Sequence, residues 1–207
     1  MKNAFVEFLG TFFLVLVVGL TVIAPGAGAM APLAIGATLM VMVYAGGHIS
    51  GAHYNPAVTL AACLRGKCET KIAPWYMAAQ VFGAFLAASI VKNCKPYTMV
   101  IAMQPQVAQA LVVELLFTFA LAYVMLNVAT AKKTAGNSYF GLAIGMTVMA
   151  SAYAAGNISG GAFNPAVAVG MTLMGLSDPN NLWLFLVGNF AGGALAALVF
   201  RVTNPDD

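Results

Sequence analysis

The segment Gly47-His48-Ile49-Ser50-Gly51-Ala52-His53-Tyr54-Asn55-Pro56-Ala57-Val58-Thr59 sets the architecture of this 207-residue chain. Its core returns 109 residues later, as Ile158-Ser159-Gly160 and then Asn164-Pro165-Ala166-Val167. Proline at the first position of a helix loses no hydrogen bond, and asparagine before it caps the free backbone N–H groups. Each Asn-Pro-Ala triplet therefore predicts the start of a helix, with the asparagine NH₂ group directed outward as a donor.

The apolar segments that begin at the triplets, about 55–64 and 164–174, are too short to cross a bilayer, which takes about 20 residues. They predict re-entrant half-helices. Hydrophobic residues make up 61% of the chain and charged residues 7%, whereas about a quarter of a soluble domain is charged. We therefore expect an all-α membrane protein with six spanning helices, at about 4–23, 31–47, 72–91, 108–128, 139–156 and 182–201.

The repeat extends over the whole chain. Leu33-Ala34-Ile35-Gly36 recurs as Leu142-Ala143-Ile144-Gly145, and the segment from Glu7 matches the segment from Glu114. Each repeat, about 1–95 and 105–207, holds three spanning helices, and an odd number makes the second repeat enter the membrane from the opposite side. The prediction is one domain of two inverted repeats, with its functional site where the repeats meet.

Two half-helices that meet N-terminus to N-terminus bring two positive dipole ends, each of about half a charge, to the middle of the membrane. A cation meets a barrier there, while a neutral hydroxyl can accept hydrogen bonds from Asn55 and Asn164. The alternative is that each Asn-Pro pair is an ordinary helix cap in a loop. Two triplets at the repeat offset, each after a glycine-rich stretch and before a half-length helix, favour paired half-helices.

Basic residues are distributed unequally over the predicted loops. Seven fall on one side of the membrane and two on the other, which predicts that both termini are cytoplasmic. They are spread over several loops without forming a patch, so nucleic-acid binding is not expected. The seven are Lys2, Arg65, Lys67, Lys71, Lys132, Lys133 and Arg201, and the two are Lys92 and Lys95.

Other readings of the chain are weaker. Cys63, Cys68 and Cys94 have none of the usual metal spacings, so neither a metal site nor a cofactor is expected. Lys2 and the apolar stretch after it also fit a cleaved signal peptide. Glu7 argues against that reading, because a carboxylate is costly inside such a stretch and the repeat would lose its first element.

These motifs resemble those of the aquaporin and aquaglyceroporin (major intrinsic protein) family. The resemblance covers the whole chain, and the first Asn-Pro-Ala block alone is highly specific. It implies a passive channel for water and small neutral solutes in the plasma membrane or the bacterial inner membrane, assembled as a homotetramer in the lipid bilayer. The segments that carry it are Glu7-Phe8-Leu9-Gly10-Thr11, Gly47 to Thr59, Gln80-Val81-Phe82-Gly83, Val113-Glu114 and Asn164-Pro165-Ala166.

The resemblance also assigns roles around the triplets. Glu7 and Glu114 match buried glutamates that brace the re-entrant loops, although an intramembrane carboxylate is also a candidate for a direct role in transport. In that family the extended residues before each triplet line the pore with backbone carbonyls, since irregular backbone is tolerated at this depth only around a wet cavity. Those residues are Gly51, Ala52, His53 and Tyr54 in the first loop and Gly160, Gly161, Ala162 and Phe163 in the second.

The chain departs from the family pattern directly after the second triplet. Most water-selective members have an arginine there, usually opposite a histidine, whereas this chain has Val167. Matching the other constriction positions by spacing gives Ile35, Ala152 and Gly161, so none of the four residues is charged or aromatic. We expect a wide, apolar outer gate. Such a gate tolerates glycerol-like polyols, urea, ammonia, hydrogen peroxide or neutral metalloid hydroxides, and a strict water channel is the alternative.

Lysines near the outer mouth, Lys92 and Lys95, could reach the vestibule. A coupled secondary transporter also uses inverted repeats, but it needs a mid-membrane ion site, and Glu7 and Glu114 do not cluster there. An enzyme needs catalytic groups within reach of each other. His48 and His53, both placed in the first re-entrant loop, are five residues apart and have no acidic cluster beside them, so we expect no enzymatic activity.

Overall fold

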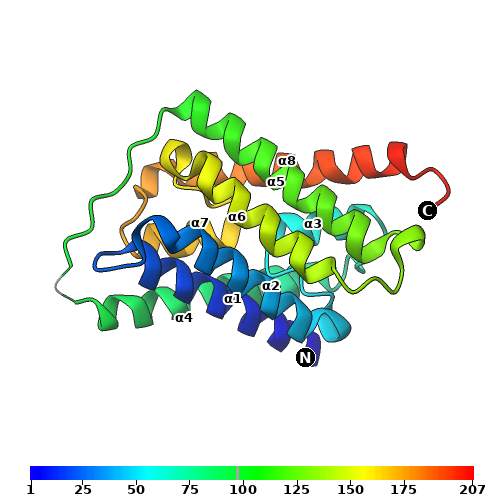
Figure 1. The fold of residues 1–207 in the computed structure, drawn as a ribbon, viewed down its shortest axis with the longest axis horizontal. Coiled ribbons are helices and arrows are strands. Elements are labelled where there is room, and N and C mark those ends of the chain that lie inside the picture. Colours follow the sequence, from blue (N-terminus) through cyan, green and yellow to red (C-terminus); the bar gives the residue numbers. More distant parts are fainter. Residues whose placement is uncertain (97) are drawn as a thin grey trace.

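The computed structural model describes residues 1–96 and 98–207, and these residues form a bundle of roughly aligned helices (Figure 1). Six helices in the described chain are long and apolar enough to cross a membrane, which confirms the predicted all-α membrane fold. They are α1 (Lys2–Val22), α2 (Ala31–Ser50), α4 (Ala73–Cys94), α5 (Val107–Thr130), α6 (Phe140–Ser159) and α8 (Leu182–Thr203).

Two shorter helices begin at the triplets, α3 (Pro56–Leu64) and α7 (Pro165–Leu173). Turns of 3-10 helix, η1 (Gly28–Met30), η2 (Lys132–Thr134) and η3 (Pro179–Asn181), precede or follow long helices. In Figure 1, α3 lies toward the end of the bundle that holds both termini, and α7 lies toward the opposite end. The two half-helices therefore enter from opposite ends.

Helices α2 and α6 run three residues farther than the sequence predicts, to Ser50 and Ser159. The glycine that ends each helix is Gly51 with φ 90° or Gly160 with φ 96°, and this left-handed conformation is what stops a helix. Earlier glycines in these stretches stay helical. His48 consequently lies on α2 and is exposed, so placing it in the re-entrant loop was wrong.

Packing follows the repeat. Helix α1 packs along α4 and α5 packs along α8, while α2 crosses α6 and joins the two halves. The crossing is close because Gly36 and Gly145 face each other; a Cβ atom at Gly36 would lie 2.7 Å from the carbonyl oxygen of Gly145. Each half-helix packs on the other half of the chain, α3 against α8 and α7 against α4.

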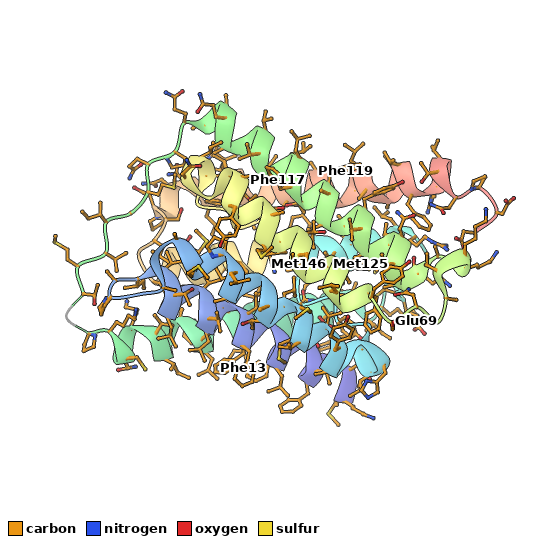
Figure 2. All side chains as sticks on the ribbon, viewed as in Figure 1. Phe13, Glu69, Phe117, Phe119, Met125 and Met146 are labelled. Atoms are coloured by element: carbon orange, nitrogen blue, oxygen red, sulfur yellow. The ribbon has the colours of Figure 1, made fainter. Side chains whose placement is uncertain are left out.

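The outer surface of the bundle is apolar. Phe13 projects from α1 at the edge of the molecule (Figure 2), and Phe82 and Leu198 are also exposed on α4 and α8. Exposed apolar side chains on this scale fit a surface that faces lipid.

Polar contacts gather at the end of the bundle that holds the termini. The guanidinium of Arg65 pairs with Asp207 at 3.2 Å and lies over the ring of Phe200 at 4.7 Å. Arg201 donates to the carbonyl oxygen of Leu64. Both arginines are therefore at the end of the molecule opposite the start of α2.

Candidate functional site

The two triplets form matching helix caps. Asn55 is in an extended conformation, and its Oδ1 accepts from the N–H groups of Ala57 at 2.8 Å and Val58 at 3.4 Å. Asn164 has the same conformation and accepts from Ala166 at 2.9 Å and Val167 at 3.4 Å. Pro56 and Pro165 occupy the first helical positions, where no hydrogen bond is lost.

Each asparagine also reaches across to the other repeat. Nδ2 of Asn55 donates to the carbonyl oxygen of Phe163 at 2.9 Å, and Nδ2 of Asn164 donates to the carbonyl oxygen of Tyr54 at 2.8 Å. These reciprocal bonds hold the two half-helix starts together. They also use one N–H of each amide and one lone pair of each carbonyl, so one N–H and one lone pair remain on each side.

The loops before the triplets have unusual backbone geometry. Ala52, Tyr54 and Phe163 all have left-handed φ angles, at 51°, 49° and 47°. Such conformations cost non-glycine residues on the order of 1 kcal/mol or more and persist only where the surroundings hold them. At the position that corresponds to Ala52, the second loop has Gly161, with φ 70°.

The first loop is held by a fully buried carboxylate. Oε1 of Glu7 accepts from Ser50 Oγ at 2.6 Å and from the backbone N–H of His53 at 3.0 Å. Oε2 accepts from the N–H of Tyr54 at 2.6 Å and from Nε2 of Gln80 at 2.8 Å. The carboxylate thus ties α1 and α4 to the end of α2 and to the strained loop.

The second loop is held in the same way. Oε1 of Glu114 accepts from Ser159 Oγ at 2.6 Å and from the N–H of Ala162 at 3.0 Å. Oε2 accepts from the N–H of Phe163 and from Nδ2 of Asn189, both at 2.7 Å. The loop N–H groups are the partners that the bracing role predicts, whereas the serine and amide side-chain partners were not predicted, although they also recur at the repeat offset.

The histidine of the first loop is buried and bonded. His53 Nδ1 lies 3.1 Å from Thr59 Oγ1, and the ring packs edge-on against Tyr76 with centroids 5.5 Å apart. These contacts hold the ring against α3 and α4. They give His53 a packing role in the loop.

A cavity of about 430 Å³ runs past the triplets. All four predicted constriction residues, Ile35, Ala152, Gly161 and Val167, line it, together with both triplet asparagines. The loop residues expected at the pore also line it, with the exception of Gly51, which is exposed outside it. Apolar side chains make up much of the rest of the lining, among them Leu14, Val18, Leu39, Leu121, Met125, Ile144 and Val148.

Among the lining residues that sequence reasoning missed are two polar ones, Tyr153 and Asn157. They lie one turn apart on α6, are exposed and line the cavity. Asn157 corresponds to His48 in the first repeat, so the repeat offset is the signal that points to it.

Charge is kept away from the cavity. Nζ of Lys95 donates to the carbonyl oxygens of Leu20 and Pro25, both at 2.8 Å, and to that of Ile23. These bonds hold Lys95 at the end of α1, and it does not line the cavity. No charged residue lines the cavity in the described ranges 1–96 and 98–207.

The cysteines and the acidic residues do not form a metal site. In the part of the chain that the structure describes, no three histidine, cysteine, aspartate or glutamate residues gather closely enough to hold an ion. All three cysteines are free. Burial, and then the neighbouring Cys63 thiol, raise the pKa of Cys68 to about 12, so this thiol stays protonated at neutral pH.

Comparison with known proteins agrees with this architecture. The family model for the major intrinsic protein matches residues 1–200. Aquaporin NIP1-4 of Oryza sativa subsp. japonica is 40% identical over 95% of this chain and 74% of its own length. The glycerol uptake facilitator protein-like 6 of Lactiplantibacillus plantarum is 36% identical over the full length of both chains.

A solved structure shares the fold. The X-ray structure of the aquaglyceroporin from Plasmodium falciparum superposes with a TM-score of 0.82, at 22% identity, over 99% of this chain and 97% of that one. Together with the six apolar helices, these similarities make the protein an integral membrane channel, not an enzyme. The chain belongs to the major intrinsic protein family.

Proposed function

We propose that this channel passes small uncharged solutes of glycerol size as well as water, and that it excludes ions. The observation that carries the proposal is the composition of the cavity beside the second half-helix. Ile35, Ala152, Gly161 and Val167 all line it and offer no charge, no aromatic ring and little bulk. A wide apolar section of this kind admits the carbon skeleton of a polyol, which a narrow section with a fixed guanidinium would hinder.

The polar side of the cavity supplies replacement hydrogen bonds. A solute hydroxyl that loses water can accept from the free N–H of Asn55 or Asn164 and can donate to loop carbonyls such as that of Ala162. The apolar part of the lining contacts the carbon atoms. A lining that is polar on one part and apolar on another suits glycerol, which has both hydroxyl groups and a carbon skeleton. The name of the Lactiplantibacillus relative points to the same solute.

Ion exclusion rests on the half-helices. The starts of α3 and α7 are tied together by the reciprocal asparagine bonds, so two positive dipole ends face the same short section of the cavity. Acidic groups do not offset them, because the carboxylates of Glu7 and Glu114 are fully buried among their own donors. A cation would therefore lose its hydration and meet positive potential at once.

The remaining assignments follow the charge distribution and the family. We propose a homotetramer with one pore per subunit and both termini in the cytoplasm. The excess of basic residues at the end of the bundle that holds the termini supports this orientation.

The test is a stopped-flow comparison on proteoliposomes that measures water, glycerol, urea and arsenous acid permeability at matched protein density. We expect facilitated glycerol flux that persists when the proton gradient or the sodium gradient is collapsed. Rapid water flux with glycerol, urea and arsenous acid all at the level of empty liposomes would overturn the proposal in favour of a strict water channel. Gradient-dependent flux would indicate coupled transport.

A further inference from the structure

The inverted repeat gives every residue of the outer constriction a counterpart at the inner, termini-bearing half of the pore. At the repeat offset of 109, Ile35 corresponds to Ile144 and Val167 corresponds to Val58, so two members are of the same type in both rings. The other two differ in size. Ala152 corresponds to Val43 and Gly161 corresponds to Ala52, and in both cases the inner residue is the larger.

The inner ring is also more completely buried. In the outer ring Ile35, Ala152 and Gly161 are partly exposed, and Val167 alone is buried. Every member of the inner ring is buried, with exposed fractions that stay at or below 5%. The values are 2% for Val43, 3% for Ala52, 2% for Val58 and 5% for Ile144.

The cavity has the same asymmetry. Ala152, Tyr153, Gly156 and Asn157 line it on α6, whereas their counterparts on α2 do not, among the residues that the structure describes. Those counterparts are Val43, Tyr44, Gly47 and His48. On α1 the lining continues to Val22, but its partner on α5, Ala129, is not part of it. The cavity therefore extends to the outer ends of α2 and α6 and ends near the inner ring, where Ala52, Val58 and Ile144 line it and Val43 does not.

A specific contact joins α2 and α6 at this inner end. At the inner end, the Tyr44 hydroxyl donates to the carbonyl oxygen of Ser138 and accepts from the N–H of Leu142, both at 3.1 Å. Its ring packs edge-on against Phe140 with centroids 5.1 Å apart. At the outer end the counterpart of Phe140 is Ala31, which has no ring to offer Tyr153. The inner ends of α2 and α6 are thus tied together and the outer ends are not.

We infer that the narrowest section of this pore is the inner ring, Val43, Ala52, Val58 and Ile144, and that this ring sets the upper size limit for solutes. The outer ring acts as a wide apolar vestibule. The inference rests on the proposed function only in that the solutes are neutral molecules that pass through this cavity. It assigns size selection to residues on the opposite side of the triplets from the family's outer constriction.

The decisive experiment changes residues at the two positions where the rings differ, so that one ring takes on residues of the other. The double variant Val43→Ala/Ala52→Gly gives the inner ring the composition of the outer one, and Ala152→Val gives the outer ring one inner residue. Glycerol and the four-carbon polyol erythritol are then measured in proteoliposomes, with water permeability and the detergent elution profile as controls. Ala52→Gly also removes a Cβ from a left-handed residue, so this change is expected to fold.

We expect the double variant to conduct glycerol at least about 3-fold faster than the parent and to admit erythritol, while Ala152→Val changes glycerol flux less than about 2-fold. If the double variant does not fold, Ala52→Gly alone is expected to raise erythritol flux. The inference is overturned if widening the inner ring leaves both polyol fluxes unchanged, or if Ala152→Val lowers glycerol flux as strongly as widening raises it. If the parent protein excludes glycerol and the double variant admits it, the proposed function is contradicted, while the inference that the inner ring limits solute size is supported.

Discussion

The loop sites around Glu7 and Glu114 are alike at the carboxylate and different around it. Each carboxylate accepts from one serine, two backbone N–H groups and one amide, at distances that match within 0.1 Å between the two repeats. The serine and amide partners recur at the repeat offset as well. Both carboxylates have the same task, which is to pair the N–H groups that the strained loop buries on the side away from the cavity.

Around this shared centre the first repeat carries more polar anchors. Tyr76 donates to the carbonyl oxygen of Ser50 at 3.0 Å, and Tyr54 donates to that of Met42 at 2.9 Å. The corresponding residues in the second repeat, Phe185 and Phe163, have no hydroxyl. The first loop is therefore cross-linked more strongly than the second, on the same side of the molecule where the cavity is closed.

The amide side chains that bind the two carboxylates also differ in their second hydrogen bond. Nε2 of Gln80 reaches Thr59 on the half-helix at 3.0 Å, whereas the shorter Asn189 reaches Thr118 on α5, also at 3.0 Å. The counterpart of Thr118, Thr11, is buried with no hydrogen-bond partner for its hydroxyl within residues 1–96 and 98–207. The counterpart of Thr59 in the second repeat is Ala168, which has no hydroxyl, so the Asn189 amide braces the neighbouring spanning helix instead of the half-helix.

Replacing the carboxylates tests this comparison most severely. Glu114→Gln and Glu7→Gln both replace one acceptor oxygen with an NH₂ donor, so donors that pointed at that oxygen lose their partner, and we expect each change to destabilise the protein by about 1–3 kcal/mol. Glu114→Gln should cost more, because the second loop lacks the tyrosine bonds. Thermal unfolding of the detergent-solubilised protein measures both. Two variants of parental stability that no longer transport would instead assign the carboxylates a direct role.

The next largest effect is expected at the outer ring, from Val167→Arg. The guanidinium is bulkier than isopropyl and always charged, and Ala152 and Gly161 leave room for it beside the cavity. Glycerol flux should fall about 10-fold, which corresponds to about 1.4 kcal/mol in the barrier, while water flux falls less. The control is Val167→Leu, which adds bulk without charge. Equal losses of water and glycerol flux in the arginine variant would argue against selective narrowing.

Removing a single anchor from the first loop has a smaller expected effect. Tyr76→Phe loses the bond to Ser50 and leaves that carbonyl oxygen buried, at a cost of about 1 kcal/mol. The reverse change in the other repeat, Phe185→Tyr, should not stabilise the protein, since the Phe185 side chain is already fully buried. Unfolding midpoints of the two variants make the comparison. If the unfolding midpoint of Tyr76→Phe equals that of the parent within experimental error, the extra hydrogen bond does not stabilise the protein.

The smallest effect is expected from Asn55→Asp and Asn164→Asp. A carboxylate still caps the half-helix, but it offsets part of the positive dipole end, an interaction of about 0.3–1 kcal/mol. Cation leak measured in proteoliposomes should rise a few-fold and equally in both variants, because the two caps have the same geometry. Asn55→Ser and Asn164→Ser keep a neutral cap and serve as controls. A leak that rises in one variant alone would show that the two half-helices are electrostatically unequal.

The sequence by itself determined the membrane fold, the spanning helices and the two half-helices. These features depend on local properties: the length of apolar runs, the capping preference of asparagine before proline, and a repeat offset that keeps Asn55 and Asn164 in register. Helix ends were less predictable. Gly47 and Gly156 stay helical while Gly51 and Gly160 turn left-handed, and a glycine is compatible with both conformations.

Tertiary structure alone decided which distant groups meet. The asparagine amides bond to carbonyl oxygens of the opposite loop, and Lys95 is held by the end of α1 instead of reaching the cavity. Likewise the cavity reaches the outer ends of α2 and α6 but not their inner ends, where Tyr44 packs on Phe140; the counterpart of Phe140 at the outer end is Ala31. Each of these outcomes depends on backbone atoms that are far apart in the chain and a few ångströms apart in space, and residue type and spacing do not encode that distance.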